Sequence, residues 1–148
     1  MKKRFLKALG SFFLILSLVS TGGSEARAFQ VTSGRGTLIL MLRLPKGYEF
    51  IAGAPFALET LSASRDVVSF PAPPPRHFNP VNGHTKIPFA TRPGKTLVTI
   101  RAKLFYCNKT SKMCFQNTRE ARLTIEIAPN GPNIIFYIWD VLPEMNAR

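Results

Sequence analysis

The feature that most constrains the fold is a long alternation of apolar and polar residues around the only two cysteines. Across residues 97–106 the apolar side chains fall at even positions, and across residues 115–127 they fall at odd positions near the end of the run. A period of two buries one face of a strand and exposes the other. The two runs therefore predict a β-hairpin with Cys107 and Cys114 at the mouth of a six-residue loop.

The rest of the chain also favours strands. Extended runs lie at residues 36–44, 48–51, 55–61, 66–70 and 84–90, and turns rich in Pro and Gly separate them. No segment with a helical period competes with these runs after residue 28. Several short strands in a chain of this size predict an all-β fold, an immunoglobulin-like antiparallel β-sandwich that carries the cysteine hairpin.

Residues 1–28 have the layout of a secretory signal peptide. A cluster of Lys and Arg precedes an apolar run at residues 8–19, and Ala26 and Ala28 form a small-residue cleavage site before Phe29. The alternative is a transmembrane anchor, but the run is shorter than the ~20 residues that a span needs. We expect cleavage to leave a single domain over residues 29–148, periplasmic or secreted, with no stable membrane span.

The charge and the motifs narrow the function classes. The chain carries a net charge of +12, and loss of residues 1–28 removes five basic residues and one acidic residue, leaving +8. This excess favours acidic partners or membrane surfaces, whereas export argues against a nucleic-acid partner. No phosphate-binding loop, Ser/His/Asp set or carboxylate pair indicates an enzyme class. His77 and His84 do not have zinc-site spacing with the cysteines, so we expect no metal and no cofactor.

The cysteine pair is the candidate site. An oxidising compartment allows Cys107 and Cys114 to form a disulfide, because directly opposed residues of antiparallel strands have Cα atoms about 4.5–5.5 Å apart. Parity places both sulfurs on the polar face, and the positive charges of Lys109 and Lys112 in the loop favour a thiolate. The spacing leaves two hypotheses open: an exchanging pair, or an inert cross-link worth roughly 2–3 kcal/mol.

The hairpin also resembles a known family. The pattern is an aromatic-Tyr-Cys, a short polar loop, a second Cys and a strand that closes on a hydrophobic-x-Pro. Here these elements are residues 105–107, Cys114 and residues 127–129, with Leu-Pro-x-Gly-Tyr and Ala-Pro elements at residues 44–48 and 54–55. Over about residues 36–129 the chain resembles the DsbD N-terminal (alpha) domain family and the related C-terminal domains of NHL-repeat thioredoxin-like proteins.

The resemblance implies an immunoglobulin-like fold with a redox-active pair. Cys107 and Cys114 would exchange electrons with thioredoxin-like or other extracytoplasmic redox proteins. The 148 residues contain neither a transmembrane electron conduit nor a thioredoxin domain, so we expect the electron source to be another protein. The Pro-rich residues 66–80 are the candidate for the family's cap loop. The alternative is a non-catalytic extracytoplasmic binding or assembly domain whose disulfide is purely structural.

The C-terminal extension, residues 130–148, lies beyond this resemblance. Its segment 133–142 (NIIFYIWDVL) is apolar on both faces of a strand and too short to span a bilayer. Two interpretations follow: an added buried strand, or an exposed segment that docks on a partner.

Overall fold

The computed structural model describes residues 26–70 and 78–143. These residues form strands joined by turns, with one short 3-10 turn and no α-helix. The elements are β1 (Arg27–Val31), β2 (Gly34–Arg43), β3 (Tyr48–Phe50), β4 (Ala57–Ser62), β5 (Val68–Ser69), the turn η1 (Pro80–Asn82), β6 (His84–Thr91), β7 (Lys95–Asn108), β8 (Cys114–Ile127) and β9 (Ile134–Asp140). The prediction of an all-β chain is confirmed.

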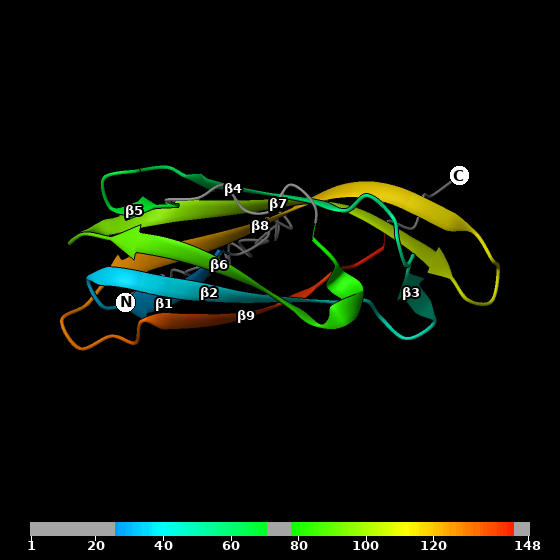
Figure 1. Ribbon diagram of the computed structural model, residues 1–148, viewed down its shortest axis with the longest axis horizontal. Coiled ribbons are helices and arrows are strands. Elements are labelled where there is room, and N and C mark those ends of the chain that lie inside the picture. The colour runs from blue at the N-terminus through cyan, green and yellow to red at the C-terminus, as the bar shows by residue number, and fades with distance from the viewer. Residues whose placement is uncertain (1–25, 71–77, 144–148) are drawn as a thin grey trace, which may run out of the picture.

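The strands form two packed sheets. The first sheet, sheet A, has the order β1-β8-β7-β3, and β4 pairs with β7 on the same side as β3. The second, sheet B, has the order β5-β6-β2-β9. Figure 1 shows the strands running along the long axis, with the β7–β8 hairpin extending at one end of the molecule. The β-sandwich is therefore confirmed, while its immunoglobulin-like character stays a prediction.

Each sheet contains one parallel pair, whereas the sequence predicted antiparallel strands. β1 pairs in parallel with β8, and β2 pairs in parallel with β9. Parallel neighbours cannot be joined by a tight turn, so the local turn signals that reveal a hairpin do not reveal them. The predicted cleavage before Phe29 falls inside β1, where Arg27 and Ala28 already pair with β8.

The core lies between the sheets, where the predicted alternation is confirmed. The even positions of β7 from Val98 to Tyr106 are fully buried. Sheet B contributes the facing layer, which includes Leu38, Leu40, Ile87, Phe89, Ile135 and Tyr137. Apolar packing thus holds the long central strand β7 on its core side, and the odd positions of β7 lie on the outer face of sheet A.

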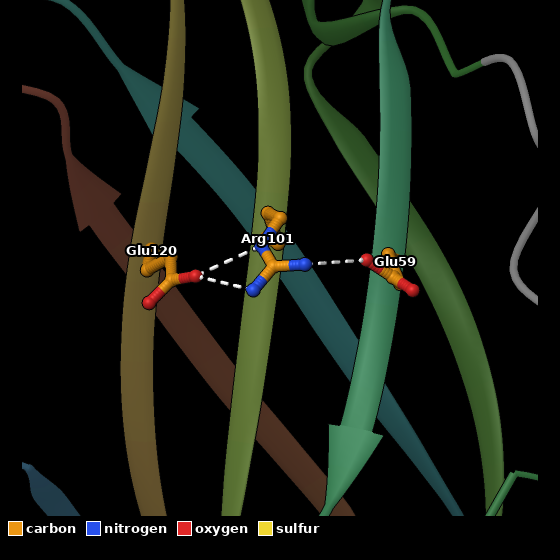
Figure 2. Close-up of polar contacts among 3 residues, drawn as sticks. All are labelled: Glu59, Arg101 and Glu120. Atoms are coloured by element: carbon orange, nitrogen blue, oxygen red, sulfur yellow. Dashed lines mark hydrogen bonds and ion pairs between the residues drawn. The ribbon is translucent and has the colours of Figure 1, made fainter.

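An ion-pair ladder crosses that outer face. Arg101 on β7 donates through Nε to Glu120 on β8 at 2.8 Å and through Nη1 to Glu59 on β4 at 3.1 Å (Figure 2). The hydrogen bond to Glu120, followed by its charge, raises the pKa of Arg101. Exposed ion pairs contribute little stability one by one, and this ladder joins residues that the strand register already places side by side.

Residues 1–25, most of the expected signal peptide, lie outside the described residues. Within the described part of the chain, no helix is long and apolar enough to cross a membrane.

Candidate functional site

Cys107 and Cys114 form a disulfide at the end of the β7–β8 hairpin. The S–S bond is 2.03 Å long, the Cα atoms are 4.0 Å apart, and the register pairs the two residues directly. The Asn108 N–H donates to the Met113 carbonyl at 2.8 Å, so the cysteines occupy a non-hydrogen-bonded position of the ladder. Opposed Cα atoms come closest at such positions. The observed separation is shorter than the ~4.5–5.5 Å expected from the sequence, in the direction that this position favours.

The loop between the cysteines is an ordered turn. The Asn108 side-chain oxygen accepts hydrogen bonds from the N–H groups of Thr110 and Ser111, at 2.8 and 3.0 Å. The Lys112 N–H donates to the Asn108 carbonyl at 2.9 Å, and Lys112 adopts a φ of 59°. Asn is well suited to this arrangement because its short side chain bonds the backbone just ahead of it. The loop is therefore held by its own hydrogen bonds as well as by the disulfide.

The two cysteines differ in access because their strands have different neighbours. Cys107 lies in a central strand, between Cys114 on β8 and Glu49 on β3. β1 pairs with β8 only over residues 123–127, so no strand within residues 26–70 and 78–143 lies beside Cys114 on the side away from β7. Accordingly Cys114 is exposed and Cys107 is half-buried. As predicted from parity, both lie on the face of sheet A opposite the core, and Cys114 is the more exposed of the two.

The charges around the pair differ from the sequence prediction in one respect. Lys109 lies 3.5 Å (Nζ to Oε2) from Glu49, the residue across the ladder from Cys107. The sequence predicted that both Lys109 and Lys112 favour a thiolate, but Glu49 offsets the charge of Lys109. Within the described residues, Lys112 makes no ion pair. Glu49 itself was missed, although it directly follows the Leu-Pro-x-Gly-Tyr element at residues 44–48.

A cluster of aromatic side chains extends from β7, near the disulfide, into the core. Phe105 precedes Cys107 by two residues on the same face of β7, and its ring lies 5.7 Å from that of the buried Phe56. Phe56 also contacts Phe50 and Phe78, both at 5.9 Å. Phe78 belongs to the segment predicted as a cap loop, of which residues 71–77 lie outside the described residues. Along β7, the half-buried Phe105 therefore precedes the disulfide and the polar turn follows it.

Other features of the described residues offer no competing chemistry. A groove of about 910 Å³ runs along β4, and the residues that line it include Arg65, Arg101 and Lys103. It contains no cysteine or histidine. No group of three or more metal-binding side chains gathers in the part of the chain that the structure describes. His84 lies on sheet B, away from the disulfide, and His77 lies outside the described residues.

Comparison with known proteins adds no assignment. No protein-family model matches the chain, and no curated protein is significantly similar to it. The function is therefore argued from the geometry of the hairpin.

Proposed function

We propose that this protein is an exported thiol–disulfide interchange module that exchanges electrons with thioredoxin-like partners through Cys107 and Cys114. The observation that carries the proposal is the exposure of Cys114 on an open strand edge at the end of a hairpin. A purely structural cross-link gains nothing from such exposure. A sulfur that a partner thiolate must approach along the S–S axis requires it.

The exchange begins at Cys114. A thiolate of the partner attacks the Cys114 Sγ, the S–S bond to Cys107 breaks, and Cys107 leaves as a thiolate that takes a proton from solvent. A second partner thiolate then attacks the partner sulfur of the mixed disulfide and releases Cys114 as a thiolate. Two electrons have moved, so the partner dithiol is now a disulfide and this pair is a dithiol. The reverse sequence reduces a partner disulfide.

The surroundings support these steps. The positive charge of Lys112, two residues before Cys114, favours the thiolate that forms when the mixed disulfide resolves. Phe105, half-buried and two residues before Cys107 on the same face of β7, provides an apolar contact on the cysteine face of the strand. Apolar contact surrounded by polar groups is the usual anatomy of a protein–protein contact.

The fold is expected to persist when the pair is reduced, as an electron relay requires. The β7–β8 pairing extends from Lys95↔Glu126 to Cys107↔Cys114, and the strands bury their core side chains well before the disulfide is reached. The Asn108 turn keeps its own hydrogen bonds. A structural cross-link would instead be needed where pairing and packing are sparse.

The reduction potential of the pair tests the proposal. We expect equilibration with thiol redox buffers to give a value above about −300 mV, in the range of thioredoxin-like oxidoreductases, with native near-ultraviolet circular dichroism in both states. Cys107→Ser should then trap a mixed disulfide with a thioredoxin-like protein, and the double variant C107S/C114S is the matched control. A pair that stays oxidised throughout, or whose reduction unfolds the domain, would instead establish the structural role.

A further inference from the structure

The outer face of β9 and β2 is an apolar surface that the redox proposal does not use. β9 is the last strand of sheet B, with Ile135, Tyr137 and Trp139 toward the core and the alternate residues toward solvent. Phe136 is 68% exposed, and Ile134 and Ile138 beside it are 40% and 39% exposed. The C-terminal segment is therefore an added strand with one buried face and one exposed apolar face, and its docking on a partner stays a prediction.

The register joins β9 and β2 into one patch. Phe136 lies directly across from Ile39, and Ile138 lies across from Met41, which is 37% exposed. Alternate residues of a strand lie about 6.6 Å apart and neighbouring strands about 4.8 Å apart. We call this surface the β9–β2 patch; its residues are Ile39, Met41, Ile134, Phe136 and Ile138. Leu142, 75% exposed, follows just beyond the end of β9.

Positive charge borders the patch. On β6, Lys86 and His84 lie directly beside Ile39 and Met41 of β2. Arg35 lies nearer the start of β2. Within the described residues, Lys86 and Arg35 make no ion pair. The acid on this face, Asp140, is neutralised by Arg43 at 2.8 Å. The face therefore combines an apolar centre with uncompensated cations at its border.

We propose that the β9–β2 patch docks this protein on an anionic lipid bilayer. Apolar side chains flanked by Lys and Arg bind such surfaces by burying apolar area in the interface while the cations meet lipid phosphates. The net charge, +12 for the full chain and +8 after the expected loss of residues 1–28, acts in the same direction.

The extent and charge of the patch favour lipid over a second copy of the chain. The exposed apolar area is on the order of 400 Å² if a large apolar residue exposes about 200 Å² when free. A stable dimer buries about 800 Å² on each partner. Two copies docked face to face would also bring Lys86 and Arg35 of both chains together, whereas a bilayer supplies opposite charge.

Docking in this way leaves the disulfide accessible. The cysteines lie on the outer face of sheet A, while the patch lies on the outer face of sheet B. A bound molecule would rest on sheet B and present its hairpin to partners along the membrane surface. The inference stands independently of the redox proposal, because it uses none of the same residues.

Tryptophan fluorescence on vesicles tests the docking. Phe136→Trp places a reporter in the patch, Gln116→Trp places one on the exposed outer face of β8, and the wild-type chain gives the baseline of Trp139, which faces the core. The full chain is purified as the expressing cell processes it, so that the N-terminus is the same in all three proteins. Vesicles are made from phosphatidylcholine alone or from an equal mixture with phosphatidylglycerol, each with brominated acyl chains as quenchers.

On the mixed vesicles we expect F136W to shift to the blue and to lose more than half of its added emission, while Q116W changes little. Lys86→Glu in the F136W background should weaken this response on the order of tenfold. Equal quenching of the two reporters, or equal quenching of F136W on neutral vesicles, would overturn the proposal. A blue shift of F136W without vesicles, rising with protein concentration, would assign the patch to a second copy instead.

Discussion

The side-chain amide of Asn117 donates a hydrogen bond to the hydroxyl of Tyr106 at 2.6 Å, across the β7–β8 ladder. Tyr106 is fully buried, and its ring contacts those of Tyr48 and Phe115 at 6.0 and 5.6 Å. It directly precedes Cys107 and points to the opposite side of the sheet. The disulfide-bearing end of the hairpin is therefore supported from the core side by a tyrosine whose hydroxyl has a hydrogen-bond partner.

Removal of the Asn117 donor should destabilise the protein more than removal of the hydroxyl. Asn117→Leu leaves the Tyr106 hydroxyl buried without its partner, at a cost of about 1–3 kcal/mol. Tyr106→Phe leaves only the half-buried amide of Asn117, which water can reach, so we expect it to lower the free energy of unfolding by about 1 kcal/mol. Urea unfolding of the oxidised proteins measures both, and the double variant reports their coupling. Equal costs for the two single variants would contradict this ranking.

The two cysteines should differ in chemical reactivity. In the single-thiol variants C107S and C114S, we expect iodoacetamide to modify Cys114 several-fold faster than Cys107, because Cys107 lies between two paired strands. Mass spectrometry of timed samples at one pH gives both rates, and the same reaction in urea gives the intrinsic reactivities. Equal rates in the native state would remove Cys114 as the entry point.

The two loop lysines should contribute unequally. In the single-thiol variant C107S, Lys112→Gln should slow the alkylation of Cys114 a few-fold, because it removes the unpaired cation that favours the thiolate. Lys109→Gln should have a smaller effect, since Glu49 offsets that charge. Glu49→Gln is the matched control: it frees Lys109 and should speed the reaction. All three effects should shrink at high salt, where exposed charges are screened, and identical effects of the two lysine variants would contradict the assigned pairing.

The Arg43–Asp140 pair should contribute to the pH dependence of stability. The hydrogen bond from Arg43 is the largest influence on Asp140 and lowers the pKa of this carboxyl below its ordinary 3.8. A lowered pKa in the folded state adds stability above the unfolded pKa, and this stability is lost as the pH falls through the folded value. The melting temperature of the wild type should therefore exceed that of Asp140→Asn at neutral pH, and the difference should shrink as the pH falls below 3.8 and through the lowered pKa of Asp140. A difference that stays constant as the pH falls far below 3.8 would contradict this.

Gly131 should tolerate no side chain. A Cβ at this position would lie 2.5 Å from the Val31 carbonyl carbon and 2.9 Å from the Thr32 nitrogen, and both are backbone atoms. Gly131→Ala should therefore move the end of β1 and cost about 1–3 kcal/mol, as overpacking does. Gly83→Ala separates the two possible causes of a loss of stability, because its positive φ brings backbone strain while the open space around it brings no clash. A G131A variant as stable as wild type would show that the two segments separate easily.

The sequence predicted the features that depend on local pattern. The alternation on β7 gave the buried and exposed faces correctly, and with them the placement of Cys107 and Cys114 on the outer face. The hairpin was predictable because its strands are neighbours along the chain. The partners of β1 and β9 were not, since both pair in parallel with strands far away in sequence. The same limit hid Glu49, which reaches Cys107 only through the β3–β7 pairing.

The parallel pairing of β2 with β9 has a consequence for how the molecule is assembled. Leu38 pairs with Ile135, almost a hundred residues later in the chain, and Phe29 pairs with Ile125 over a similar separation. Contacts of such long sequence separation slow folding, because the intervening chain must be closed into a loop first. The central hairpin can form early, but sheet B keeps an open edge until its last strand arrives. A chain threaded across a membrane from its N-terminus would therefore stay incompletely folded until nearly all of it has emerged.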